Sequence, residues 1–275
     1  MPRNNHIENL NMQFCRQILG VQKNTTTHGV LLELGRTPLM LEAQRLSLKN
    51  WERIKDEKGN ILLCQSHQNA CTKNLDWYQK IKDLLSNHGM QYRLTDPSQK
   101  NTANAFIGRA KDMFHQEAFT QIKNPESKLR TYGLIKQEIG REEYLLQIKN
   151  TKIRQKLTKF RLSNHKLMIE TGRHVKPKPI DKEQRICPVC HLKVEDEIHF
   201  LTECKIYDTL RKPLIDDCKT LRPQFIYYSR KEQFVYIMTT PLLMGNVSRF
   251  IANAFEDRDI YLDACATLNS ILDQI

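Results

Sequence analysis

Cys187-Pro-Val-Cys190 and His199-Phe-Leu-Thr-Glu-Cys204 are the two short stretches around which this sequence is organised. Two thiols on a tight turn reach one metal ion, and a helix supplies an imidazole and a third thiol from neighbouring turns. A closed set of three cysteines and one histidine is typical of a structural zinc site rather than a catalytic one. The spacing therefore predicts one Zn²⁺ bound by Cys187, Cys190, His199 and Cys204.

The metal is expected to stand in for a hydrophobic core in this segment. Structural zinc in such peptides is worth about 10–16 kcal/mol at neutral pH, which exceeds what so short a segment gains from burial. We expect chelation to melt residues 181–210 alone. Ile198 and Phe200 are expected to pack under the knuckle, and Glu195-Asp196-Glu197 to favour the start of its helix.

The cluster has two other interpretations. Cys187-Pro-Val-Cys190-His191 also matches the pattern of covalent haem attachment, but that chemistry requires export and a second axial ligand, and it leaves Cys204 unused. His191 is a second candidate for the imidazole ligand in place of His199. Its adjacency to Cys190 would strain tetrahedral coordination shared by the two.

The composition indicates a chain of the cytoplasm or nucleus. No apolar run approaches the roughly 18 residues that a membrane helix needs, and no hydrophobic stretch follows the polar N-terminus. Thiols stay reduced in those compartments. The eight cysteines of the 275 residues are therefore not expected to form a disulfide framework.

The positive charge is concentrated in one segment. The formal net charge is +12, and residues 149–178 hold ten Lys or Arg against one acid, Glu170. A basic block of this kind often marks a polyanion partner, although a solvated helix face with no partner remains an alternative. The residues expected to contact phosphates are Lys152, Arg154, Lys156, Lys159, Arg161, Lys166, Arg173, Lys176 and Lys178.

Apolar residues recur at helical spacing almost throughout, which predicts a mainly α fold: a helical array with a small zinc knuckle and a C-terminal helical segment. Gly20, Lys58-Gly59-Asn60, Gly89 and Asn124-Pro125 are expected to end helices, and the run Ile61–Cys64 is either a strand or a turn of helix. Each apolar stripe is expected to face a core. The stripes are Ile7, Leu10, Phe14 and Ile18; Ala103, Phe106, Ile107, Ala110, Met113, Phe114 and Ala118; and, as one helix, Leu145, Ile148, Ile153, Leu157 and Phe160.

Turn signals and the charge block divide the chain into five expected regions. Lys176-Pro-Lys-Pro-Ile180 is predicted to be a stiff spacer, because residues before proline avoid the helical conformation. The regions are an N-terminal helical region (1–95), a second helical region (96–148), the basic helix with its spacer (149–180), the knuckle (181–210) and C-terminal helices (211–275).

The sequence contains no recognisable catalytic motif. Leu214-Ile-Asp216-Asp217 places paired aspartates after apolar residues, as in polymerases, but it lies in a helical pattern without a third carboxylate. The sequence contains no glycine-rich phosphate loop and no nucleophile elbow. The chain is therefore expected not to be an enzyme.

Several stretches resemble the C-terminal region of LINE-type (non-LTR) retrotransposon reverse-transcriptase polyproteins. The resemblance covers roughly residues 10–215 and is weaker over 60–140. The stretches are Phe14-Cys-Arg-Gln-Ile-Leu-Gly20, Leu32-Glu-Leu-Gly-Arg-Thr-Pro38, Phe160-Arg-Leu-Ser-Asn-His165, Ile169-Glu-Thr-Gly-Arg173, Arg185-Ile-Cys187-Pro-Val-Cys190 and Glu195-Asp-Glu-Ile-His199-Phe-Leu-Thr-Glu-Cys204, followed by Tyr207 and Arg211.

The resemblance implies that the knuckle binds zinc and takes part in nucleic-acid binding, with the four residues named above as ligands. The polymerase aspartates and the endonuclease of that family are missing, which implies a detached C-terminal part. A decayed element fragment and a retained host gene remain alternatives.

The expected function is non-enzymatic binding of RNA or DNA, largely without sequence preference. The alternative is a zinc-stabilised protein–protein interaction module. The sequence leaves the choice between RNA and DNA and the oligomeric state open.

Overall fold

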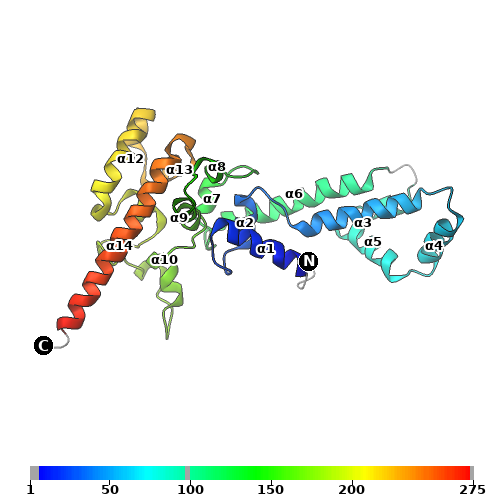
Figure 1. Cartoon of the computed structure of the whole chain (residues 1–275), viewed down its shortest axis with the longest axis horizontal. Helices are drawn as coiled ribbons and strands as arrows, with labels where there is room; N and C mark the ends of the chain where they lie inside the picture. The colour runs from blue at the N-terminus through cyan, green and yellow to red at the C-terminus, as the bar shows by residue number, and fades with distance from the viewer. Residues whose placement is uncertain (1–5, 97–99, 273–275) are drawn as a thin grey trace. The chain divides into compact units, whose positions relative to one another are not determined.

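The computed structural model describes residues 6–96 and 100–272, and their regular secondary structure is helical. Within these ranges no strand forms, and only isolated bridges join Leu34 to Arg141 and Ile186 to Val194. The mainly α fold predicted from the sequence is confirmed (Figure 1). No helix in the described part of the chain has the length and apolar character needed to cross a membrane.

The chain forms two compact units. The first comprises Met1–Met12 and Arg36–Phe119, and the second comprises Gln13–Gly35 and Thr120–Ile275. Helices α1 (His6–Leu19) and α6 (Thr102–Lys123) contribute residues to both. The basic segment and the knuckle, which were expected to be separate regions, belong to the same unit.

The first unit is built on α3 (Leu39–Lys55), α4 (Ile61–Thr72) and α5 (Asp76–Asn87), which pack on one another, followed by η1 (Gln91–Leu94). The Asn60 side chain accepts a hydrogen bond from the Leu63 amide and so caps α4. The run Ile61–Cys64 is therefore helical. The buried apolar side chains of the first unit include Leu48, Trp51, Ile81, Leu85 and Phe106.

The second unit is centred on α14 (Met244–Leu272), which packs along α9 (Thr151–Arg161) and α12 (Asp208–Leu221) (Figure 1). Its helical elements are α2 (Thr27–Glu33), α7 (Tyr132–Ile135), α8 (Tyr144–Gln147), α9 (Thr151–Arg161), α10 (Met168–Thr171), η2 (Gly172–His174), η3 (Lys182–Gln184), α11 (Glu197–Thr202), η4 (Lys205–Tyr207), α12 (Asp208–Leu221), η5 (Pro223–Tyr227), α13 (Arg230–Thr239), η6 (Pro241–Leu243) and α14 (Met244–Leu272).

Phe200 is the aromatic centre of this unit. Its ring stacks on Phe255 of α14 with a centroid separation of 4.7 Å. Phe160 of α9 lies 5.7 Å from it and Tyr207 of η4 lies 5.0 Å from it. Because Phe200 follows His199 directly, the knuckle is anchored in a hydrophobic core that α9 and α14 share. The expectation that the metal alone replaces a core here was wrong.

Two expectations about helices also need correction. On α1, Ile7, Leu10, Phe14 and Ile18 are 46–65% exposed, and the buried side chains are Met12, Cys15 and Leu19. Met113 of α6 is likewise 43% exposed. The helix predicted to run from Leu145 to Phe160 is broken, because the Asn150 side chain accepts hydrogen bonds from the amides of Lys152 and Ile153 and starts α9 anew.

A buried ion pair joins α2 to α9. The Arg161 guanidinium lies 2.7 Å from a carboxylate oxygen of Glu33, and the two side chains are 1% and 0% exposed. The Tyr144 hydroxyl donates to the same carboxylate at 2.5 Å. Arg161 also pairs with Glu142 and donates to the Met238 carbonyl. This network fixes four helices of the second unit to one another.

Gly35 lets the chain turn tightly after α2. Its φ is +61°, and a Cβ at this position would lie 2.3 Å from the backbone nitrogen of Arg141. We expect Gly35→Ala to lower the free energy of unfolding by about 1–3 kcal/mol, because a non-glycine residue is strained there and the backbone must also shift. Urea denaturation followed by circular dichroism measures this.

Gly108 provides the matched control, because it lies inside α6 and a Cβ there would have no neighbour within 4 Å. We expect Gly108→Ala to raise stability by about 0.5–1 kcal/mol, the helix-propensity gain. Equal effects of the two substitutions would contradict this description of the turn.

Candidate metal centre

The first two cysteines of the centre lie on a tight turn. The Cys187 amide donates to the Lys193 carbonyl at 2.8 Å, and the His191 amide donates to the Cys187 carbonyl at 2.9 Å. His191 closes the turn with a φ of +57° and its side chain is exposed. This turn places the Cys187 and Cys190 thiols on the same side, while His191 is not part of the cluster.

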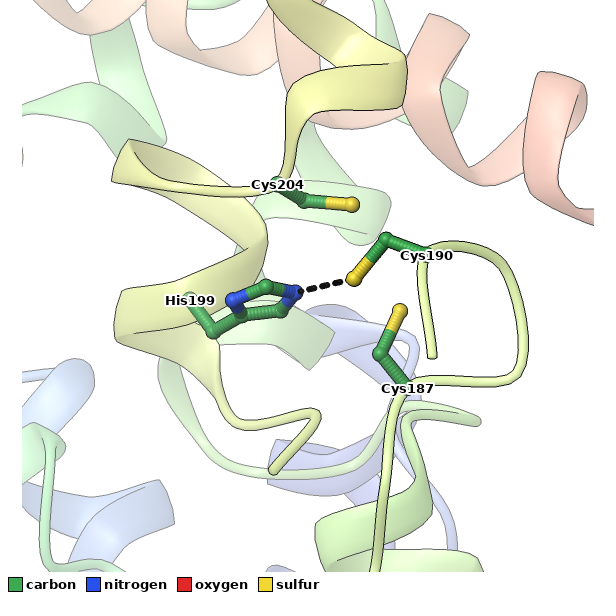
Figure 2. Close-up of side chains that lie close together, drawn as sticks. All are labelled: Cys187, Cys190, His199 and Cys204. Atoms are coloured by element: carbon green, nitrogen blue, oxygen red, sulfur yellow. Dashed lines mark hydrogen bonds between the residues drawn. The ribbon is translucent and has the colours of Figure 1, made fainter. Parts of the chain in front are cut away.

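Helix α11 and the residues just after it supply the other two ligand candidates, His199 and Cys204. The Asp196 side chain accepts a hydrogen bond from the His199 amide at 2.7 Å and caps the helix. The Cys204 amide donates to the His199 carbonyl at 2.9 Å just beyond the last turn. His199 and Cys204 therefore face the Cys187–Cys190 turn together, as Figure 2 shows.

The ligand atoms of these residues all lie within 4.8 Å of one another. Cys190 Sγ and His199 Nε2 lie 3.3 Å apart, within hydrogen-bond distance (Figure 2). A tetrahedral ion with metal–ligand distances of about 2.0–2.3 Å requires separations of about 3.3–3.8 Å between its ligands. Small side-chain shifts would bring the whole set into that range. Cys187, Cys190, His199 and Cys204 are thus a group that could hold one metal ion.

The side chains of the cluster are close enough to shift one another's pKa values. A hydrogen bond to Cys204, together with burial, raises the pKa of Cys187 to about 12. The same hydrogen bond lowers the pKa of Cys204. Burial disfavours the charged form of His199, but the Cys187 and Cys190 sulfurs raise its pKa to about 9. A bound cation would replace these protons and relieve the crowding of the sulfurs, so the donor set fits a metal ion that prefers thiolate and imidazole.

Glu203 lies behind the histidine, on the side away from the thiols. His199 Nδ1 lies 3.5 Å from a Glu203 carboxylate oxygen and is buried without a hydrogen bond in the described structure. Lys193 in turn lies 2.9 Å from Glu203. A carboxylate behind a ligating histidine typically fixes the ring and its tautomer, which leaves Nε2 for the metal.

Arginines from outside the knuckle hold its backbone and its acids in place. Arg258 of α14 forms a buried ion pair with Glu195 at 2.7 Å. Arg211 of α12 donates to the carbonyls of Leu201 and Cys204, both at 2.8 Å. Arg130 lies 2.8 Å from the buried Glu197 carboxylate. The expected role of these acids at the start of α11 is thus accompanied by pairing with distant arginines.

The expected spacer is folded back on the chain. The Ile180 amide donates to the Gly172 carbonyl at 2.9 Å, and the Arg185 side chain donates to the Ile169 and Ile180 carbonyls. The loop around Lys176 is therefore tied to the knuckle at its base.

The residues expected to contact phosphates fall into three groups. Lys152, Lys166, Lys176 and Lys178 are exposed, and Arg154, Lys156, Lys159 and Arg173 are half-buried. Lys156 and Lys166 form ion pairs with Glu256 and Asp259 of α14. Arg161 is buried and paired with two carboxylates, so its inclusion among surface phosphate contacts was wrong.

The paired aspartates lie on α12, as the helical pattern predicts. Asp216 lies 3.8 Å from Lys219, and Asp217 accepts a hydrogen bond from Asn246. Neither belongs to a group of metal-binding side chains within the described residues.

A second basic segment escaped the sequence analysis. Residues 205–231 hold seven Lys or Arg against three acids. The acids of the C-terminal region as a whole hid this excess, because residues 179–275 carry more acidic than basic side chains. Charge counted in shorter windows would have found it.

No protein-family model, no curated protein and no solved structure matches this chain.

Proposed function

We propose that the chain is a non-enzymatic zinc-knuckle protein that binds RNA or DNA through the basic segment 149–178. The convergence of Cys187, Cys190, His199 and Cys204 on one point carries the proposal. Three thiolates and one imidazole close the coordination shell of Zn²⁺, which makes the metal structural.

The proposed nucleic-acid surface consists of the basic side chains that remain accessible. Lys152 and Lys159 are seven positions apart on α9, and Lys176 and Lys178 lie on the loop before the knuckle. Ammonium groups of this kind contact phosphates and give affinity without much sequence preference. Arg154, Lys156, Lys166 and Arg173 extend the surface.

We also propose that the chain derives from the C-terminal part of a LINE-type reverse-transcriptase polyprotein. This proposal rests on the stretches that carry the resemblance, and the Glu33–Arg161 pair joins two of them, Leu32–Pro38 and Phe160–His165.

Salt dependence tests the proposed surface. We expect fluorescence anisotropy with labelled RNA and DNA oligonucleotides to show binding that weakens steeply with salt. Lys152→Gln with Lys159→Gln should reduce the slope of log K against log [salt] by about 1.4–1.8, since each lost phosphate contact contributes about 0.7 for single strands and 0.9 for duplex DNA.

Lys58→Gln with Lys73→Gln is the matched control, because both lysines are exposed and lie in the first unit. Its slope should equal that of the wild type. Absence of binding at low salt, or equal slopes for all three proteins, would rule out phosphate contacts at Lys152 and Lys159.

A protein-interaction module is the second candidate. Tyr261 and Leu268 of α14 are 36% and 60% exposed and lie seven positions apart, so both are on one face of the helix. An exposed apolar face of this kind favours a protein partner. Partner capture that survives nuclease treatment, from a protein that does not bind oligonucleotides, would favour this function instead.

A further inference from the structure

A two-part cleft lies beside the metal centre, between α11, α12 and the η5–α13 segment. The smaller part has a volume of about 200 Å³ and is lined by Cys190 and His199 themselves. The larger part has a volume of about 370 Å³ and extends to Phe225 and Ile226. Glu203, Lys205 and Arg230 line both parts. We call the two parts together the knuckle cleft.

The charges of the knuckle cleft favour an anionic ligand. Its lining contains five basic side chains and two acidic ones. Glu203 is paired with Lys193, and Asp208 is paired with Arg211. Lys205 and Arg230 are exposed, and the hydrogen bond of Arg230 to Gln233 leaves its charge uncompensated. A bound Zn²⁺ with three thiolates adds one negative charge, which does not cancel the excess.

The rim of the knuckle cleft is apolar. Leu192 is 66% exposed at the smaller part, and Ile226 is 54% exposed at the larger part. Tyr227, next to Ile226, is 82% exposed. Unpaired bases offer flat faces to such side chains, whereas a duplex hides its base faces in the stack. Phosphate contacts inside the cleft and apolar contacts at its rim thus suit a single strand better than a duplex.

We propose that the knuckle cleft binds a single-stranded segment of nucleic acid, with phosphates at Lys205 and Arg230 and an unpaired base against Ile226. This inference rests on the proposed nucleic-acid binding and adds a second contact surface, separate from the basic segment 149–178. The basic segment 149–178 supplies affinity for single strands and duplexes alike, and the knuckle cleft supplies the preference for a single strand.

The test compares a labelled 20-nucleotide single strand with its blunt duplex, using the full-length protein loaded with zinc. In Lys205→Gln with Arg230→Gln, the Kd for the single strand should rise about tenfold or more, and the salt slope should fall by about 1.4. The Kd for the duplex should change less than about twofold. Ile226→Ser should weaken single-strand binding about three- to tenfold, a fraction of the worth of one stacked base, without changing the salt slope.

The results distinguish failure of the cleft inference from failure of the proposed function. All three side chains are exposed, and zinc content together with circular dichroism verifies that the variants are folded. The cleft variants could bind the single strand like the wild type while Lys152→Gln with Lys159→Gln loses affinity. In that case the inference that the knuckle cleft binds the strand is wrong, and the proposed function stands. Equal losses for single strand and duplex would overturn the strand preference. A wild-type protein that binds neither ligand at low salt would overturn both proposals.

Discussion

Cys187→Ser is expected to abolish zinc binding and to lower the melting temperature of the second unit by about 10 °C or more. Serine cannot supply the thiolate that completes the shell, and structural zinc contributes about 10–16 kcal/mol in isolated knuckles. A loss of even 3–5 kcal/mol corresponds to about 10 °C for a unit of this size. Thermal melts by circular dichroism, with and without a chelator, measure the effect.

The loss should extend beyond the knuckle. Phe200 and Tyr207 pack against α9 and α14, so loosening residues 187–204 exposes a core that these helices share. Hydrogen exchange should therefore show lost protection in α9 and α14 as well as in residues 181–210. This differs from the selective melting that the sequence alone suggests.

Cys265→Ser is the control for a lost thiol, because Cys265 is half-buried on α14 and outside the cluster. It should keep its zinc and its response to chelator. The Cys187→Ser protein should be indifferent to chelator, because it has no metal to lose. Chelation that leaves the wild-type melt unchanged would show that metal does not stabilise the fold.

Arg161→Met is expected to lower the free energy of unfolding by about 3–5 kcal/mol, since removing one partner leaves a buried charge uncompensated. Here the remaining charge is the Glu33 carboxylate, which is 0% exposed. Urea denaturation of the second unit measures the loss. The same substitution should leave the salt slope of nucleic-acid binding unchanged once the protein is folded.

The double variant Glu33→Met with Arg161→Met separates the ion pair from general packing damage. Replacing a buried pair by apolar side chains of similar volume is often neutral, so the double variant should recover most of the lost stability. Losses that simply add would mean that the pair does not interact as described. A changed salt slope in folded Arg161→Met would restore Arg161 as a phosphate contact.

The candidate site was predictable because its ligands are close together in the sequence. Cys187, Cys190, His199 and Cys204 fall within one short segment, and ligand spacing constrains their geometry directly. The partners that anchor this segment were not predictable. Arg258 lies 63 positions from Glu195, and Arg161 lies 128 positions from Glu33. The local sequence does not show which basic residue of a charge block will form a buried ion pair with a distant carboxylate.

Helices were easier to predict than their environments. Glycines and the Asn124-Pro125 pair located the C-terminal ends of α1, α3, α5 and α6, because these signals act within a few residues. Burial is different, since it depends on what packs against a helix. Helix α1 carries two apolar stripes, one through Leu10 and Phe14 and another through Met12 and Cys15, and only tertiary contacts decide which one is buried.

X-ray absorption at the zinc edge of the purified full-length protein tests the central claim most directly. We predict one zinc per chain, bound by three sulfurs at about 2.3 Å and one nitrogen at about 2.0–2.1 Å. The sulfur contribution should fall in Cys204→Ser if that variant retains any metal. A protein that contains no zinc under reducing conditions, or zinc bound by oxygen atoms, would contradict the claim that these four side chains form one metal centre.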